Sequence, residues 1–300
     1  MRDIYIFFSY TDKEVIMKIL AFSDVTKWIG YEQIVKKYKP DVVCLCGDLV
    51  SDGSAWIYHE EFFEQIPKFR TEVEKLRKKY EYKEKLGEFE VIRYHKDYTE
   101  LSYSLKKKFM DTPEYHQLKN LLHVDKFYSF LSYAGARSKV LLVKGDHDDD
   151  FKGDYDVERI NSIPGCSEIS DKLVEVKGFR FLGVSAKDAH NQRKLQRFSK
   201  NLRGQVDVVL MHGENVKLVS MISPMLIIKG GLFVTKCRVN GIPTVFTGPN
   251  SFSLIEFNNR GVQEVHQYLT WGNKPQLIKE KEIAKNCSLL SKRYPWIKPL

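Results

Sequence analysis

Four short apolar runs, each followed within three residues by an acid or a histidine, constrain the fold of this chain more than any other feature. Apolar runs of this length, bounded by turn residues, are typical of strands that are covered on both faces. The sequence therefore predicts an α/β fold with helices outside the sheet. The runs and the residues that follow them are Lys18–Phe22 with Asp24, Asp41–Cys46 with Asp48, Lys139–Val143 with Asp146-His147-Asp148, and Val206–Met211 with His212.

Further strands are predicted later in the chain, where apolar alternation is bounded by Gly or Asn turns. They cover 171–176, 178–184, 252–257 and 261–268. Helical spacing over Tyr31–Lys39, which ends before Pro40, predicts a helix between the first two strands.

The stretch 53–137 departs from this rhythm and predicts a mainly helical insert. Its apolar residues recur every three or four positions, as on one face of a helix. Such a face could also support oligomerisation. We therefore divide the chain into an N-terminal extension or edge strand (1–16), a main domain (17–270) interrupted by the insert, and a basic C-terminal tail (271–300). The apolar series begins with Phe62, Ile66, Phe69, Val73, Leu76 and Tyr80.

Cysteine usage and hydropathy predict a cytoplasmic protein without a membrane segment. The five cysteines are odd in number and scattered, which favours reduced thiols. No apolar segment reaches the ~18–20 residues that a membrane span needs.

The acids and histidines at the four strand ends are the candidate site. In an open α/β sheet, ligands bind at the carboxyl ends of the strands, so these side chains are expected to converge. Carboxylates and imidazoles on such loops are typical ligands of divalent metals. A single Asp after a strand is usually a turn residue, but four such ends in order favour a site.

In these blocks the chain resembles the calcineurin-like metallophosphoesterases. The family pattern is Asp-x-His, Gly-Asp, Gly-Asn-His-Asp/Glu, a lone His and Gly-His-x-His. The resemblance covers about 17–270 and implies a four-layer αββα sandwich of the metallophosphoesterase type, with the helical insert between the second and third blocks. The corresponding residues here are Asp24-Val-Thr26, Gly47-Asp48, Gly145-Asp146-His147-Asp148, His212 and Gly230-Gly231-Leu232-Phe233.

The resemblance also implies two metals, but several of their ligand positions are changed in this chain. The first metal would be held by positions that are here Asp24, Thr26, Asp48 and Phe233. Thr is a poor ligand and Phe is none. The second metal would share Asp48 and use positions that are here Asp146, His212 and Gly231.

We therefore expect one divalent ion rather than two. Its ligands would be Asp48, Asp146 and His212, with Asp24 as a further candidate. Mn²⁺ is the preferred ion, and Fe, Zn or Mg also suit oxygen and imidazole donors.

The activity implied by the resemblance is hydrolysis of a phosphomonoester or phosphodiester. His147 matches the family's general acid, and Asp148 could orient it or cap a turn. The changed ligands leave an alternative open, in which the chain is a catalytically inactive relative that binds a protein or nucleic acid.

The net charge of +9 lies mostly after residue 137 and suits an anionic partner. A predicted surface helix within Lys187–Arg203 presents Arg193, Arg197 and Lys200 on one face. These side chains are candidate contacts for a phosphorylated small molecule or a nucleic acid, although a solvated helix face has the same pattern.

Overall fold

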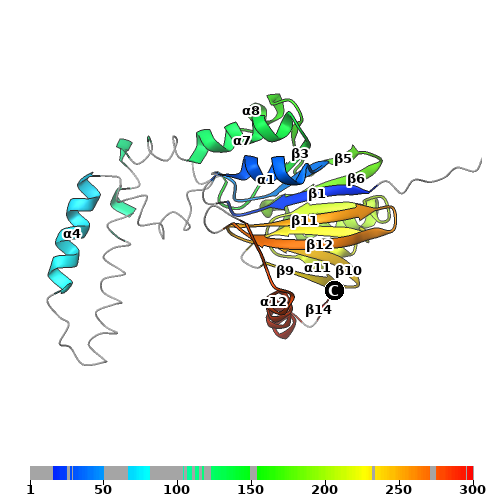
Figure 1. The fold of residues 1–300 in the computed structure, drawn as a ribbon. Helices are drawn as coiled ribbons and strands as arrows, with labels where there is room; N and C mark the ends of the chain where they lie inside the picture. The colour runs from blue at the N-terminus through cyan, green and yellow to red at the C-terminus, as the bar shows by residue number, and fades with distance from the viewer. Residues whose placement is uncertain are drawn as a thin grey trace, which may run out of the picture.

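A computed structural model shows two seven-stranded sheets packed face to face, with helices on both outer sides (Figure 1). The α/β sandwich predicted from the sequence is therefore confirmed. The residues that the structure describes are 16–25, 28, 30–50, 67–81, 104, 107–109, 112–114, 117, 123–148, 154–231, 234–270, 275–294 and 296–299.

The first sheet contains the first three predicted strands, which run parallel to one another. The strand β11 (Ser251–Asn258) pairs antiparallel with β1 (Met17–Phe22) along the whole length of β1, and the sheet continues beyond β11. In spatial order the strands are β13 (Gln276–Leu277), β12 (Gly261–Leu269), β11 (Ser251–Asn258), β1 (Met17–Phe22), β2 (Val42–Cys46), β3 (Lys139–Val143) and β4 (Cys166–Glu168).

The second sheet contains the fourth predicted strand, β7, in a parallel set with its neighbours. In spatial order the strands are β14 (Ile297–Pro299), β9 (Thr235–Val239), β10 (Ile242–Thr247), β8 (Leu226–Gly230), β7 (Val208–Met211), β6 (Phe179–Val184) and β5 (Leu173–Val176).

Each central strand is apolar throughout because both of its faces are buried. In β1, Ile19 and Ala21 belong to the core between the two sheets. Leu20 and Phe22 alternate with them and belong to the core beneath the outer helices. This arrangement explains the continuous apolar runs, since strands in a one-sided sheet would alternate apolar and polar residues.

Helices cover both outer faces, so the molecule has four layers (Figure 1). The first sheet is covered by α1 (Tyr31–Tyr38), α7 (Asp125–Gly135) and α8 (Val157–Ser162). The second sheet is covered by α10 (Gln192–Leu202), α11 (Val216–Ser220) and α12 (Glu280–Arg293).

The expected helical insert is described only in part. The helix α4 (Pro67–Glu81) lies apart from the four layers in Figure 1, and Phe69 there packs edge-on against Phe109. By contrast, α7 packs on the first sheet through five buried residues, so it belongs to the layered body rather than to a separate insert. The boundary of the insert at 137 therefore extends too far, because α7 buries its apolar face in the main core.

Both chain ends were assigned as separate segments from the sequence. The suggested N-terminal edge strand lies outside the described residues. The C-terminal tail docks on the body, because β14 pairs with β9 and α12 buries Cys287 and Leu290 against the second sheet. All five cysteines are buried free thiols, and none of the described helices is long and apolar enough to cross a membrane.

An aromatic cluster fixes the loop that carries Asp48. Trp28 is 1% exposed and stacks on Phe130, with Tyr31 and Phe127 around it. Its indole nitrogen donates a hydrogen bond of 2.8 Å to the carbonyl oxygen of Leu49. Trp28 thus connects the helices α1 and α7 to Leu49, the residue that follows Asp48.

Candidate metal centre

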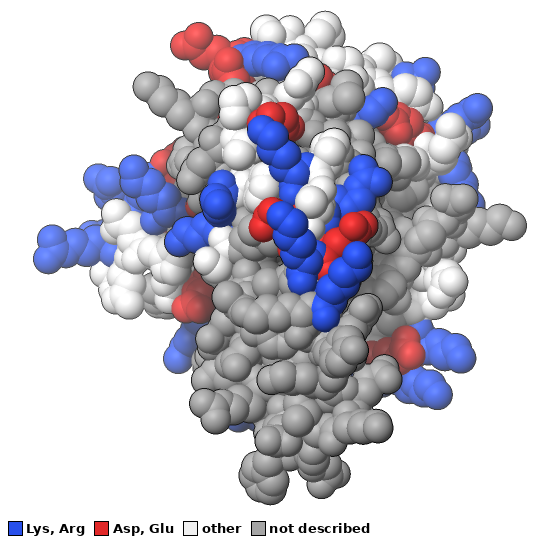
Figure 2. Space-filling view, turned by 90° about the vertical axis from the view of Figure 1, so that its left-hand side faces the viewer, with Lys and Arg blue, Asp and Glu red and all other residues white. Residues whose placement is uncertain are grey.

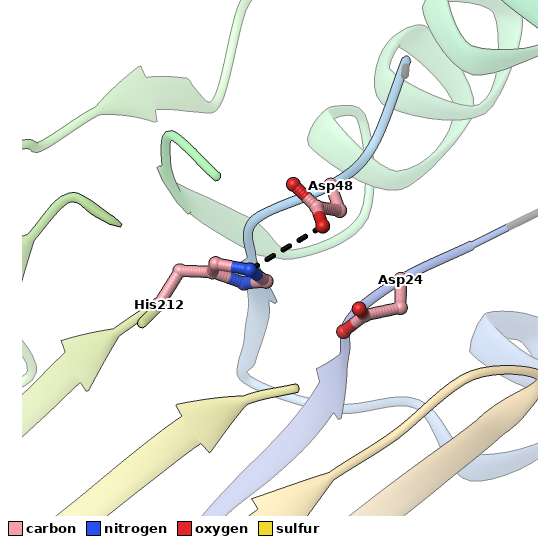
Figure 3. A group of neighbouring side chains, drawn as sticks. All are labelled: Asp24, Asp48 and His212. Carbon is pink, nitrogen blue, oxygen red and sulfur yellow. Dashed lines mark ion pairs between the residues drawn. The ribbon is translucent and has the colours of Figure 1, made fainter. Parts of the chain in front are cut away.

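The four predicted strand ends meet at one edge of the sandwich. Asp24 follows β1 and Asp48 follows β2 in the first sheet, whereas His212 follows β7 in the second sheet. Figure 3 shows these three side chains pointing toward one another across the junction of the two sheets. The third strand end, after β3, adds Asp146 and His147 to the group.

Glycines permit this close approach, because a Cβ atom at three positions would collide with the site. A Cβ at Gly145 would lie 2.1 Å from Oδ1 of Asp48, and one at Gly47 would lie 2.5 Å from Cγ of His212. A Cβ at Gly230 would lie 1.9 Å from the carbonyl oxygen of Cys46. The Gly-Asp pairs of the sequence therefore reflect packing between strand ends as well as backbone freedom.

The His212 imidazole is oriented by a hydrogen bond behind it. Its Nδ1 lies 2.7 Å from the carbonyl oxygen of Cys46, which assigns the proton to Nδ1. Its Nε2 then faces Oδ1 of Asp146 at 3.0 Å. The same Nε2 lies 3.4 Å from Oδ2 of Asp48 (Figure 3). A histidine held in this way presents Nε2 to the cluster, as a metal ligand would.

The charges of His212 and Asp146 depend on one another. Burial opposes protonation of His212, but hydrogen bonds to Asp146 and Asp48 raise its pKa well above its usual value. The same bond from His212 holds the pKa of Asp146 below its usual range. Without a metal ion, a proton on His212 therefore supplies positive charge to the cluster.

Asp24 is a partly buried acid of the cluster. Its carboxylate accepts a hydrogen bond of 3.0 Å from the backbone nitrogen of Gly231 and lies against the hydroxyl of Ser23. Burial raises the pKa of Asp24 to about 6, against the opposing charge of His212. A nearby cation, such as protonated His212, thus favours the ionised form of Asp24 beside Asp48.

The donor set fits a divalent metal. Two groups of three residues each bring one ligand atom apiece within 4.8 Å of one another. One group is Asp24, Asp48 and His212, and the other is Asp48, Asp146 and His147. Asp48 belongs to both, and the donors are carboxylate oxygens and imidazole nitrogens, which suit hard and borderline divalent ions.

Asp148 joins two loops of the site through hydrogen bonds to the backbone. Both of its carboxylate oxygens accept backbone hydrogen bonds, from the nitrogens of Asp48 (3.0 Å), Leu49 (2.6 Å), Val50 (3.0 Å) and Gly145 (2.8 Å). The side chain is 2% exposed. Asp148 therefore fastens the loop after β2 to the loop after β3, which makes it a positioning residue for Asp48, and its suggested role in orienting His147 stays a prediction.

His147 lies at the mouth of the cluster. Its side chain is 41% exposed, and its Nε2 lies 3.7 Å from Oδ2 of Asp146. Its backbone nitrogen donates a hydrogen bond of 3.1 Å to Oδ1 of Asp48. His147 is thus placed either to reach an incoming molecule or to contribute a ligand atom.

Two of the changed family positions, Thr26 and Phe233, lie outside the described residues. The structure adds Ser23 and Lys229, which the sequence analysis missed. Lys229 is the one charged residue of β8, and this is the signal that could have revealed it.

The basic helix covers the outer face of the second sheet. Arg193, Arg197 and Lys200 are exposed on α10, whose buried residue Leu195 packs on the outer face of the second sheet. Figure 2 views the molecule from the side on which α4 lies in Figure 1, and on that face lysine and arginine side chains lie among acidic ones. A role for the basic helix in binding anions stays a prediction.

The fold and site define an α/β sandwich with an acid–imidazole cluster at its strand ends. No protein-family model and no curated protein matches the chain. The crystal structure of TT1561 of Thermus thermophilus is similar over 84% of this chain and 98% of that one, at 11% identity and a TM-score of 0.49. Another crystal structure is similar over 84% and 99%, at 13% identity and a TM-score of 0.48. Likeness at this level assigns neither a family nor a function.

Proposed function

We propose that the protein is a divalent-metal-dependent phosphoesterase related to the calcineurin-like metallophosphoesterases. The observation that supports this most is the meeting of four separate strand ends in one cluster, in which Asp48 is shared by two potential ligand groups. Turn residues with only local roles would have no reason to converge from two sheets. The order of the sequence motifs agrees with the proposal, and Mn²⁺ is the ion we prefer.

The residues present divide the work of such a reaction between them. Asp48, Asp146 and His212 would hold the ion, with Asp24 behind them. A bound divalent ion would neutralise charge on the phosphate and make a nearby water a better nucleophile. His147, at the exposed mouth, would protonate the leaving oxygen of the phosphoester. Asp148 keeps Asp48 in place through the backbone.

A hydrolysis assay with metal analysis tests the proposal. We expect Mn²⁺-dependent turnover of a chromogenic phosphomonoester or phosphodiester, lost in Asp48→Asn. The variant Asp125→Asn is a matched control, because this exposed acid in the first turn of α7 undergoes the same chemical change and is not one of the clustered acids. Absence of both Mn²⁺ uptake and turnover in the unmodified protein would refute the proposal.

A substitution of His147 tests whether this residue acts as the general acid. We expect His147→Ala to reduce turnover of a substrate with a poor leaving group by about 10²–10⁴-fold, the usual range for a lost general acid. A substrate with a good leaving group should be affected much less. An equal loss with both substrates would show that His147 does not act as the acid.

A further inference from the structure

Lys229 places an ammonium group beside the candidate metal centre. It is half-buried in β8, between apolar neighbours and Gly230. Its Nζ donates a hydrogen bond of 2.9 Å to the carbonyl oxygen of Gly230 and lies 5.4 Å from the ring centroid of Phe246. These two contacts orient the side chain along the end of the strand instead of outward into solvent.

The position of this ammonium relative to Asp24 is set by Gly231. A Cβ atom on Gly231 would lie 3.0 Å from Nζ of Lys229, so the amine occupies space next to that residue. The backbone nitrogen of the same glycine donates to Asp24 at 3.0 Å. Lys229 and Asp24 therefore approach the same glycine.

The charges around Lys229 are those of the cluster. Burial lowers the pKa of Lys229, and the negative charges of Asp24, Glu214 and Asp146 oppose this effect. Among the described residues, Lys229 forms no ion pair within 4 Å, so its charge acts on the cluster as a whole. A buried ammonium without a contacting carboxylate is costly unless nearby negative charge compensates for it.

We propose that the ammonium of Lys229 is a built-in cation of this centre and takes the place of a second divalent ion on the Asp24 side. The inference rests on the proposed metal centre. The three carboxylates of Asp24, Asp48 and Asp146 carry three negative charges when ionised. One divalent ion together with Lys229 balances them, whereas two divalent ions together with Lys229 would leave an excess of positive charge in a half-buried site.

The position of Gly231 supports the same conclusion. The backbone of this glycine has a φ angle of +141°, which residues other than glycine rarely adopt. A ligand side chain there would be strained and would also meet the Lys229 amine. Residue 231 therefore offers no side-chain ligand for a metal. The ammonium group of Lys229 instead places a positive charge beside it.

Manganese titration followed by electron paramagnetic resonance and calorimetry tests this inference without an activity assay. We expect the unmodified protein to bind one Mn²⁺ ion. Lys229→Gln should bind Mn²⁺ about tenfold more tightly or more, because it removes a repelling charge. Lys229→Arg should behave like the unmodified protein.

Lys139→Gln is the matched control. This half-buried lysine begins β3 at the other end of the sheet and contacts Ser167, so the same change in net charge is made away from the cluster. Its Mn²⁺ affinity should stay within about threefold of the unmodified protein, a difference smaller than the tenfold step of 1.4 kcal/mol.

Three results would overturn the inference, and they separate it from the proposed function. Binding of two Mn²⁺ ions by the unmodified protein would show that Lys229 does not replace one, and this measurement needs no folded variant. Equal affinity in Lys229→Gln and the unmodified protein would show that the ammonium has only a structural role. In both cases the metal centre stands. Absence of any Mn²⁺ binding would instead remove the centre and the proposed function together.

Discussion

Replacing Asp148 by Asn tests how the site is held together. The carboxylate of Asp148 accepts four backbone hydrogen bonds, two on each oxygen, from the loops after β2 and β3. Asparagine keeps one acceptor oxygen and turns the other position into a donor. Two of the four buried amides would then face an NH₂ group and lose their acceptor.

The expected cost follows from those two amides. Each buried donor left without a partner costs about 1–3 kcal/mol, so the pair costs about 2–6 kcal/mol. Removal of a buried negative charge close to Asp48 offsets part of this, and we expect a net loss of about 3 kcal/mol in the free energy of unfolding. For a body of this size, that corresponds to a fall of about 6–12 °C in Tm.

Urea and thermal unfolding followed by circular dichroism measure this loss. Asp125→Asn again serves as the control, and its Tm should change by no more than about 2 °C, since an exposed acid in the first turn of a helix contributes little. If the Tm of Asp148→Asn also lies within about 2 °C of the unmodified protein, the four hydrogen bonds do not hold the two loops together, and the positioning role is refuted.

Three further predictions concern the surroundings of the same cluster. Because the pKa of His212 is raised, its imidazole is protonated at pH 7, and binding of Mn²⁺ should displace one proton. Calorimetry in buffers of different ionisation enthalpy should therefore show about one proton released per ion. If no proton is released, His212 is not a ligand. Trp28→Phe should lower the free energy of unfolding by about 1–3 kcal/mol, since the carbonyl of Leu49 loses its donor; unchanged urea unfolding would refute this. Gly230→Ala should lower the free energy of unfolding by more than about 4 kcal/mol, because there is no room for a Cβ atom at this position. Gly178→Ala should lower it by about 1 kcal/mol, because Gly178 has open space around it and only an unfavourable φ. Similar losses in both variants would count against the packing argument.

The apolar runs were sufficient to predict the class of fold, because strands covered on both faces must be apolar along their whole length. They could not reveal the division into two sheets, which depends on pairings between distant segments. For example, β11 lies beside β1 although more than two hundred residues separate them in the chain. The short strands β9 and β10 were not predicted, because β9 carries few large apolar residues and Pro243 interrupts the pattern of β10.

The sequence by itself determined the acids and histidines of the candidate site, although not Ser23 and Lys229, because polar residues that closely follow parallel strands gather at one edge of the sheet. It did not determine what each residue does there. Whether Asp148 orients His147 or holds two loops depends on which backbone amides lie within reach, and whether Lys229 lies near Asp24 depends on how the second sheet packs against the first. Those distances arise only from tertiary packing, since the residues concerned lie about a hundred or more positions apart along the chain.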